Sequence, residues 1–205
     1  MGNTPKADTR KPEILEAYYQ VIIEHGIEGA SIGKIAQRMG IHPSLIIHYF
    51  KKKENLTIEL LDLLIEKYEA PEFFDFEGVS DPGERFRKLM ETTFSFEWSR
   101  TVDPGVHFCF YYLSFRNPEI RKRFRAMIKR FRNYLIKELT GFQECGVIRV
   151  DDVRIAADYI VTLMEGLEFH AHFLADDEPF EHFARTTREA AIAYLTHPAN
   201  QEGTP

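Results

Sequence analysis

The sequence has little cysteine and no long apolar segment. Its two cysteines, Cys109 and Cys145, lie far apart in apolar helical surroundings, which favours free thiols over a disulfide framework. No run of about 18 apolar residues occurs, so we expect no membrane-spanning helix and no membrane partner. The first residues, MGNTPKADTRKPE, contain no apolar segment of the kind found in secretory signal peptides. We therefore expect a cytoplasmic protein.

Motifs typical of enzymes are also lacking. The sequence contains no glycine-rich phosphate loop, no nucleophile elbow, and no Cys and His residues at zinc-site spacing. His170 and His172 stand near Glu165 and Glu168, but residues two positions apart do not share a helix face. Two pairs remain as alternatives for a metal: Glu165 with His172, seven positions apart, or Glu168 with His172, four apart. We expect no enzymatic activity, no cofactor and no metal site.

Basic residues are not in excess over the whole chain, whose formal net charge is -6. This charge excludes a surface that is basic throughout, although a local basic patch is compatible with it. Between residues 30 and 57 the only acid is Glu54, and the basic side chains are Lys34, Arg38, Lys51, Lys52 and Lys53. Such a concentration of positive charge is what contact with DNA phosphates requires.

Helical periodicity dominates the chain, and no alternating strand pattern occurs. Pro12 and Pro43 suit first turns, Ser31 suits an N-cap, and Gly26 and Gly40 suit helix ends. Helices are predicted over residues 12–24, 31–39, 43–50, 53–68, 82–100, 104–116, 118–143, 151–175 and 179–196, with a seam over 70–82. We expect an all-α fold with an N-terminal three-helix helix-turn-helix head, residues 1–53, on a larger helical bundle, residues 54–205.

The head carries a motif of specific residues in a fixed order, within HGIEGASIGKIAQRMGIHPSLIIHYFKKKENL. Its members are Gly26, Ser31, Ile32, Ile35, Ala36, Gly40, Ile41, Tyr49, Phe50, Lys53, Glu54 and Leu56. In this order and spacing the stretch from about Ile14 to Leu56 resembles the TetR family of transcription regulators. Gly33 and Ile47 depart from the residues that relatives often carry, so base specificity does not transfer from them.

The resemblance implies a recognition helix in the major groove of double-stranded DNA, built from residues 42–49. The residues expected to bind DNA are Ser31, His42, Pro43, Ser44, Leu45, His48, Tyr49 and Lys53. Ser44 and His48 are expected at base edges and Leu45 at a thymine methyl group. Ser31, Tyr49 and Lys53 are expected at phosphates. Lys6, Arg10 and Lys11 form either a minor-groove arm or a solvated tail.

Residues 94–115 are crowded with aromatic side chains and contain few polar ones. The family resemblance implies an effector-binding and dimerisation module here, and a mostly apolar cavity is typical of small-ligand sites. We expect an apolar effector, acyl or aromatic, at Phe94, Trp98, His107, Tyr111, Phe131 and Met164. The alternative is that these aromatic side chains fill a core.

The predicted helix over residues 118–143 has a basic stripe of Arg121, Arg125, Lys129 and Arg132 opposite an apolar face. This stripe is interpreted as a solvated face, as an anion site for the phosphates of an acyl-coenzyme A, or as a second DNA-contacting surface.

The last two predicted helices carry apolar stripes with small residues. The residues are Ala156, Ala157, Ile160, Leu163, Met164 and Leu167, followed by Ala190, Ala191, Ala193 and Tyr194. Two such helices from each chain would form a four-helix bundle in a homodimer, and two-fold symmetry would match a palindromic operator. Packing within one chain is the alternative.

These expectations combine into a dimeric sequence-specific regulator, a repressor released when an effector shifts the helix over residues 53–69. Activation by the effector is the alternative sign of this coupling. A DNA-binding architectural or adaptor protein without any effector is the alternative function.

Overall fold

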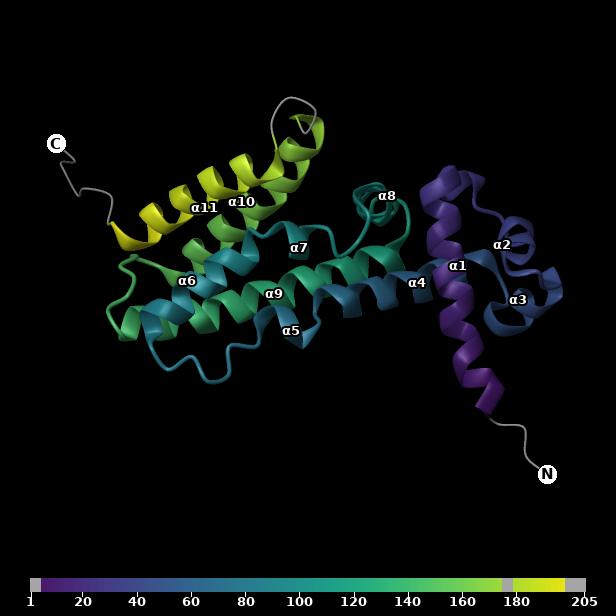
Figure 1. Ribbon diagram of the computed structural model, residues 1–205, viewed down its shortest axis with the longest axis horizontal. Helices are drawn as coiled ribbons and strands as arrows, with labels where there is room; N and C mark the ends of the chain where they lie inside the picture. Colours follow the sequence, from purple (N-terminus) through teal and green to yellow (C-terminus); the bar gives the residue numbers. More distant parts are fainter. Residues whose placement is uncertain (1–4, 175–178, 198–205) are drawn as a thin grey trace. The chain divides into compact units, whose positions relative to one another are not determined.

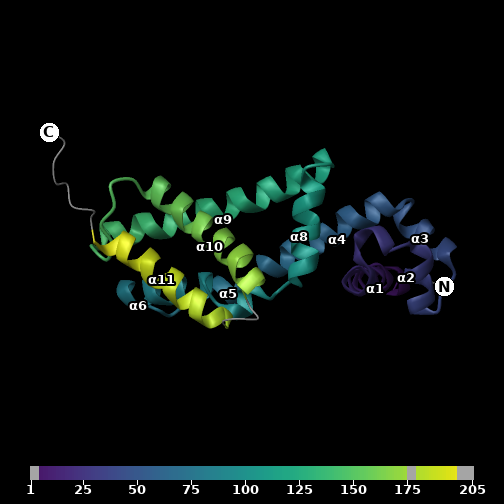
Figure 2. The same ribbon diagram turned by 90° about the horizontal axis from the view of Figure 1, so that it is seen from above.

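The computed structural model describes residues 5–174 and 179–197, and these residues form helices and connecting turns with no β-strand (Figures 1 and 2). The all-α prediction is confirmed. The described helices divide into two compact units, with divisions after residues 68, 101 and 126. The first unit contains residues up to 68 and 102–126, and the second contains 69–101 and the residues from 127 onward. This division by packing does not test the functional boundary between residues 53 and 54, which stays a prediction.

Helix α1 (Pro5–Gly29) begins earlier than the sequence predicted. Pro12 therefore lies inside the helix, and the prediction that it occupies the first turn is wrong. Gly26 has φ 67°, a left-handed backbone value that favours glycine, and it kinks the helix before its last residues. The expected stop at Gly26 is thus a kink, after which the hydrogen-bonded helix resumes as far as Gly29.

The helix-turn-helix forms as predicted, from α2 (Ile32–Met39) and α3 (Pro43–Phe50). The Ser31 hydroxyl accepts a hydrogen bond from the Lys34 backbone N–H at 3.2 Å and caps α2. Gly40 ends that helix with φ 62°. These local bonds explain why the sequence pattern alone locates both helices.

The rest of the first unit consists of α4 (Lys53–Tyr68), α8 (Pro104–Ser114) and the beginning of α9 (Pro118–Glu144). Helix α1 packs against both α4 and α8. Tyr18 of α1 is fully buried, and its hydroxyl lies 2.9 Å from that of Thr57 on α4. The Asp103 backbone N–H donates to the Tyr19 hydroxyl at 2.7 Å, which ties the start of α8 to α1.

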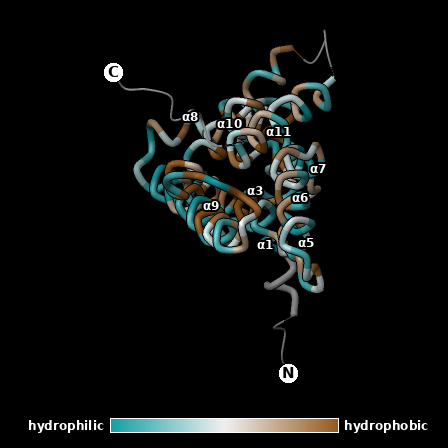
Figure 3. The backbone as a smooth tube through the Cα atoms, turned by 90° about the vertical axis from the view of Figure 1, so that its left-hand side faces the viewer, coloured by the Kyte–Doolittle hydropathy of each residue, from teal (hydrophilic) through white to brown (hydrophobic). Residues whose placement is uncertain are grey.

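The second unit contains the remainder of α9 together with five further helices: α5 (Pro71–Phe74), α6 (Pro82–Thr93), α7 (Phe96–Ser99), α10 (Val153–Leu174) and α11 (Phe180–Thr196). The tube of α9 alternates between hydrophobic and hydrophilic positions within single turns, as a helix with one buried face requires (Figure 3). Leu135, Leu139 and Phe142 are its buried positions in the core.

The prediction of one helix over residues 82–100 is wrong, because the chain breaks between α6 and α7. Ser95 is the physical cause of the second start. Its hydroxyl accepts from the Trp98 backbone N–H at 3.1 Å, so it acts as an N-cap.

Helix α10 has two apolar faces, and the residues of α10 that the sequence interpretation assigned to dimerisation lie on the buried one. Ala156, Ala157 and Ile160 are fully buried against the core of their own chain, as is Ala191 of α11. The α10 part of the stripe expected at a dimer interface therefore packs inside its own chain, which was the alternative, whereas Ala190, Ala193 and Tyr194 of α11 are exposed. A second stripe on α10 is exposed and is described below.

Within the described ranges, no helix is long and apolar enough to cross a membrane.

Candidate DNA interface and effector site

Helix α3 has one face in the core of the first unit and one face open. Ile46 and Phe50 are buried, whereas Ser44, Ile47 and His48 are exposed. Positions 44, 47 and 48 are three and four residues apart, so they share a helix face. The exposed face carries groups that suit contact with base edges: a hydroxyl, an apolar group and an imidazole. Leu45 and Tyr49 lie half-buried beside it.

Ile47 is a candidate that the sequence interpretation treated only as a departure from related sequences. Its side chain is 47% exposed, which is unusual for isoleucine beside a packed core. An exposed apolar residue between Ser44 and His48 fits a contact with a thymine methyl group. The sequence did contain a signal for Ile47, since it follows Ser44 by three residues and so shares its helix face.

His42 and Ser44 form a local cap at the start of α3. The His42 ring Nδ1 lies 2.8 Å from the Ser44 hydroxyl and accepts from the Ser44 backbone N–H at 3.3 Å. Pro43 occupies the first turn of the helix. The cap fixes the direction of the Ser44 side chain, so His42 positions Ser44 as well as standing beside it.

Most of the basic side chains of the head have partners within the protein. The Lys53 ammonium donates to the Ile27 carbonyl at 2.7 Å, and burial lowers the pKa of this amine. Lys51 bonds the His48 carbonyl, Lys52 pairs with Glu54, and Arg38 pairs with Glu24. Lys53 therefore holds the start of α4 against the end of α1, and a phosphate contact by its side chain stays a prediction.

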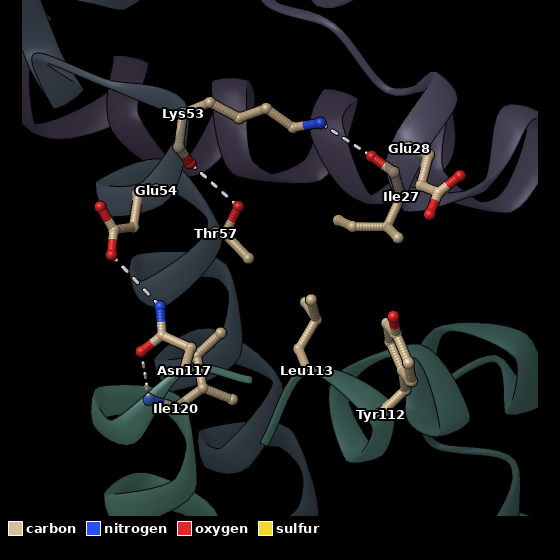
Figure 4. Close-up of a pocket in the computed structure, with 9 residues that line it drawn as sticks. All are labelled: Ile27, Glu28, Lys53, Glu54, Thr57, Tyr112, Leu113, Asn117 and Ile120. Atoms are coloured by element: carbon tan, nitrogen blue, oxygen red, sulfur yellow. Dashed lines mark hydrogen bonds between the residues drawn. The ribbon is translucent and has the colours of Figure 1, made fainter. Parts of the chain in front are cut away.

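A cleft of about 360 Å³ opens within the first unit (Figure 4). Its lining residues are Ile27, Glu28, Lys53, Glu54, Thr57, Tyr112, Leu113, Asn117 and Ile120. At one side the Asn117 amide donates to Glu54 at 3.2 Å, and at the other Lys53 reaches Ile27. These bonds connect α4 to α1 and to the corner between α8 and α9. The lining residues come from four separate segments of the chain, so no single sequence motif predicts the cleft.

In the second unit, four of the six predicted effector residues contribute to one region. Phe94 and Trp98 are buried, and Phe131 and Met164 pack half-buried against the same core. The Trp98 and Phe131 rings have centroids 5.2 Å apart. The ring centroid of Phe74 of α5 lies 5.4 Å from that of Trp98 and 5.6 Å from that of Phe131. The ring centroid of Tyr134 lies 5.5 Å from that of Phe74. We call Phe74, Trp98, Phe131 and Tyr134 the aromatic cluster.

The other two predicted effector residues belong to the first unit. The Nδ1 atom of His107 lies 3.3 Å from the Tyr68 hydroxyl oxygen. Tyr111 is half exposed and packs on Phe115 with ring centroids 5.3 Å apart. An effector contact by His107 or Tyr111 stays a prediction.

Polar groups adjoin the aromatic cluster. Glu168 of α10 accepts from Arg100 at 2.8 Å and from the Ser99 hydroxyl, next in sequence to Trp98. The Tyr134 hydroxyl is buried without a hydrogen-bond partner in the described part of the chain, and burial raises its pKa to about 12. Glu165, one turn before Glu168, is mostly buried, and burial followed by the charge of Glu168 raises its pKa.

The structure also places the residues considered for a metal site and those of the basic stripe of α9. Among the residues described, no group of three or more His, Cys, Asp or Glu side chains is placed to hold a metal ion. In the basic stripe of α9, Arg132 bonds Asp158 of α10 at 2.9 Å. Arg121, Arg125 and Lys129 are exposed, so a further role for them stays a prediction.

Comparisons with known proteins agree with this arrangement. The family model described as bacterial regulatory proteins, tetR family, matches residues 14–60. A model described as a tetracyclin repressor-like C-terminal domain matches residues 83–196. The HTH-type transcriptional regulator BetI of Rhizobium meliloti (strain 1021) is 23% identical over 194 residues, covering 95% of this chain and 92% of the relative.

Two solved structures share the fold. A transcriptional regulator from Saccharomonospora viridis, in complex with choline, has a TM-score of 0.81 at 20% identity, covering 92% of this chain and 98% of its own. FadR from Bacillus subtilis, in complex with stearoyl-CoA, has a TM-score of 0.64 at 22% identity, covering 89% of this chain and 97% of its own. Since the C-terminal domain model alone spans more than half of the sequence, the chain belongs to the TetR family of DNA-binding transcription regulators, which are not enzymes.

Proposed function

We propose that this regulator is a homodimeric repressor that binds a palindromic operator through α3 and leaves it when an effector binds. The observation that carries the proposal is the open face of α3, where Ser44, Ile47 and His48 are exposed opposite the buried Ile46 and Phe50. The residues proposed to bind DNA are Ser31, His42, Pro43, Ser44, Leu45, His48, Tyr49 and Lys53, with Ile47 added.

Selection of bound duplexes from random DNA with the full-length protein tests this operator binding. The expected product is a palindrome whose half-site centres are about 34–36 Å apart, one turn of DNA. Recovery of no preferred sequence, with binding that weakens steeply as salt increases, would contradict a specific operator.

The exposed face of α10 supports the homodimer. Its large apolar residues are Ile155, Tyr159, Phe169 and Phe173, with exposures of 61%, 36%, 58% and 67%. They follow one another at helical spacing along one face, with Thr162 and Gly166 between them. On α11, Tyr194 lies 4.4 Å from Tyr159 by ring centroids, and Ala190 and Ala193 are exposed beside it.

An exposed helix face with several large apolar residues is typical of a protein interface. Small residues on α11 let a partner helix approach closely, so a second copy of the same two-helix face is the occupant we propose. Sedimentation at decreasing protein concentration measures the assembly, and a stable monomer at micromolar concentration would contradict it.

The effector proposed is small and largely apolar, and its site includes Phe94, Trp98, Phe131 and Met164. Support comes from the aromatic cluster and from the two similar structures solved with choline and with stearoyl-CoA, ligands that each carry apolar groups. Trp98 is the only tryptophan in the sequence, so its emission reports directly on the site. A compound that releases operator DNA without changing this emission would place the effector elsewhere.

We propose that α4 and α9 transmit effector binding to the head. Helix α4 starts at the bonds of Lys53 and Glu54 that connect it to α1 and to Asn117, and α9 contributes residues to both units. Reciprocal titrations measure the coupling, because an effector that weakens operator binding must itself bind less tightly to the operator complex. Equal effector affinities with and without operator would show that the two sites are independent.

A further inference from the structure

Two carboxyl groups of α10, one turn apart, have different surroundings. Glu168 is paired with Arg100 and accepts from Ser99. Glu165 has no hydrogen bond or ion pair with any residue that the structure describes, although it is mostly buried. A carboxylate that is partly shielded from water and has no counter-charge is costly, so the charge of Glu165 is unbalanced among the described residues.

Contacts on both sides of Glu165 locate it relative to the aromatic cluster. Asp158 of α10 bonds Arg132 of α9, and Glu165 follows Asp158 by seven residues, which returns it to the same side of α10. In the second unit α9 and α10 run in opposite directions (Figures 1 and 2). Glu165 thus lies on the side of α10 that carries Asp158, and its neighbour Met164 packs against the same core as Phe131.

The second side is fixed by Glu168. This residue bonds Ser99, the last residue of α7, and Arg100, the next residue along the chain; both directly follow Trp98. Trp98 in turn packs on Phe131 at 5.2 Å. Glu165 is thus one turn from Glu168, which bonds the segment after Trp98, and adjacent to Met164, which packs against the same core as Phe131.

The chemistry of this neighbourhood is that of a site for an organic cation. Aromatic ring faces attract a cation, and indole does so most strongly. A buried carboxylate supplies the full opposite charge that rings alone lack. The Tyr134 hydroxyl, buried and without a partner in the described chain, can bond a polar group of the same ligand.

We propose that the effector of this regulator carries a compact organic cation, a quaternary ammonium or protonated amine group, whose charge is balanced by Glu165 and whose substituents contact the rings of Trp98 and Phe131. This inference rests on the proposed effector site and names its ligand class. The rings of the cluster touch one another in this structure, so the ligand replaces one of them. Phe74 is that ring, because it is only half-buried and comes from the four-residue helix α5.

A neutral acyl ligand fits the same rings less well. It would cover the Glu165 carboxylate without balancing its charge, so the carboxyl group would have to bind a proton. A cation balances the charge and adds attraction to the rings. Glu165 is therefore the specificity-determining residue of the site, and it contributes nothing to recognition of a neutral ligand.

Calorimetric titration of the full-length protein with choline and with 3,3-dimethylbutan-1-ol tests the inference, because the alcohol has the same shape but no charge. Tetraethylammonium serves as a second cationic probe. We expect the cations to bind and the alcohol to bind roughly tenfold more weakly or worse. We expect Glu165→Gln to weaken cation binding roughly tenfold and to leave binding of the alcohol unchanged.

Glu97→Gln is the matched control, since Glu97 is adjacent to Trp98 in sequence but exposed, and it should change neither affinity. Phe131→Leu is a second variant, expected to weaken the cations more than the alcohol. Equal binding of choline and the alcohol, failure of both cations to bind, or an unaffected Glu165→Gln variant would overturn the cation assignment.

A titration with stearoyl-CoA distinguishes failure of the cation assignment from failure of the proposed function. If stearoyl-CoA releases operator DNA and perturbs Trp98 emission while no cation does, the effector site stands and its cation selectivity is wrong. If no probe perturbs Trp98 emission and a ligand still releases DNA, the proposed effector site itself is wrong.

Discussion

The two units differ in how they bury polar groups. In the first unit the buried hydroxyls of Tyr18 and Thr57 bond each other, and the partly buried ammonium of Lys53 bonds a backbone carbonyl. In the second unit the hydroxyls of Thr93 and Tyr134 are buried without partners in the described chain, and Glu165 has no counter-charge. A satisfied network stabilises one conformation, whereas unsatisfied groups are positions where a ligand can add bonds.

The difference matches the tasks proposed for the units. A head that reads DNA needs side chains held in a fixed geometry before it meets the duplex. An effector site needs free energy that only a ligand supplies, since a ligand shifts an equilibrium only by its differential affinity for the two states. The comparison predicts that variants in the first unit change DNA binding or stability directly, and that variants at the aromatic cluster change the response to ligand.

The largest expected effect comes from the exposed face of α10. Phe169→Glu combined with Phe173→Glu would place charges inside the proposed dimer interface, and each buried hot-spot aromatic contributes about 2 kcal/mol or more to association. We expect a monomer by sedimentation and loss of operator binding at protein concentrations that saturate the wild type. Phe115→Glu, at an exposed aromatic residue of the first unit, is the control and should stay dimeric. A dimer that persists in the double variant would move the interface elsewhere.

A smaller effect is expected on the open face of α3. Ser44→Ala removes a hydroxyl proposed to contact a base edge and should cost about 1–3 kcal/mol on the preferred operator. The loss should be confined to one base position, because only that contact is removed. Competition binding with operators substituted at single positions measures it.

Lys34→Ala provides the contrast within the same helix-turn-helix, because Lys34 is exposed and has no ion pair among the described residues. If it contacts a phosphate, its loss weakens all sequences alike and reduces the salt dependence by about one unit of slope. An equal loss on every sequence for Ser44→Ala would show that Ser44 is not a base reader.

Local signals and distant contacts explain how much the sequence could predict. The N-cap at Ser31 and the left-handed Gly40 involve neighbours within a few residues, so α2 and α3 were located correctly from pattern alone. The bond from Lys53 to Ile27 and the cleft beside it join segments far apart in sequence, and no spacing rule announces such contacts.

The bundle was predicted less accurately for a second physical reason. Helix α10 is apolar on two faces, and periodicity identifies the stripes without telling which one faces its own core. Ala156 and Ile160 were assigned to an interface and are buried, while Ile155 and Tyr159 were passed over and are exposed. The break before α7 had a readable signal, since Ser95 precedes Phe96 and Glu97 as an N-cap precedes an acidic first turn.

The two serine caps allow the units to be compared by one substitution. Ser31→Ala and Ser95→Ala each remove a hydroxyl that accepts from a backbone N–H, at 3.2 Å and 3.1 Å, so each should lower the free energy of unfolding by about 1 kcal/mol. Chemical denaturation measures both. We expect Ser31→Ala to weaken operator binding and Ser95→Ala to change Trp98 emission and effector affinity. The opposite pattern would contradict the division of tasks between the units.

The smallest expected effect concerns the stability of the protein without ligand. Burial raises the pKa of Glu165 from its ordinary value of 4.5, so the ionised form is disfavoured in the folded chain. The stability associated with a raised pKa is complete below the unfolded value and is lost as pH rises through the folded value. Glu165→Gln avoids this loss. Its melting temperature should therefore exceed that of the wild type at pH 7, by a margin that shrinks as pH falls toward 4.

Glu97→Gln, at an exposed carboxyl, should show no such margin, and thermal unfolding at several pH values compares the two. A saturating cation should reverse the order at pH 7, because it stabilises the wild type by occupying the folded state and binds the Gln variant weakly. A Glu165→Gln variant that is less stable than wild type at neutral pH without ligand would mean that Glu165 already has a counter-charge inside the protein. Glu165 would then resemble the satisfied polar groups of the first unit.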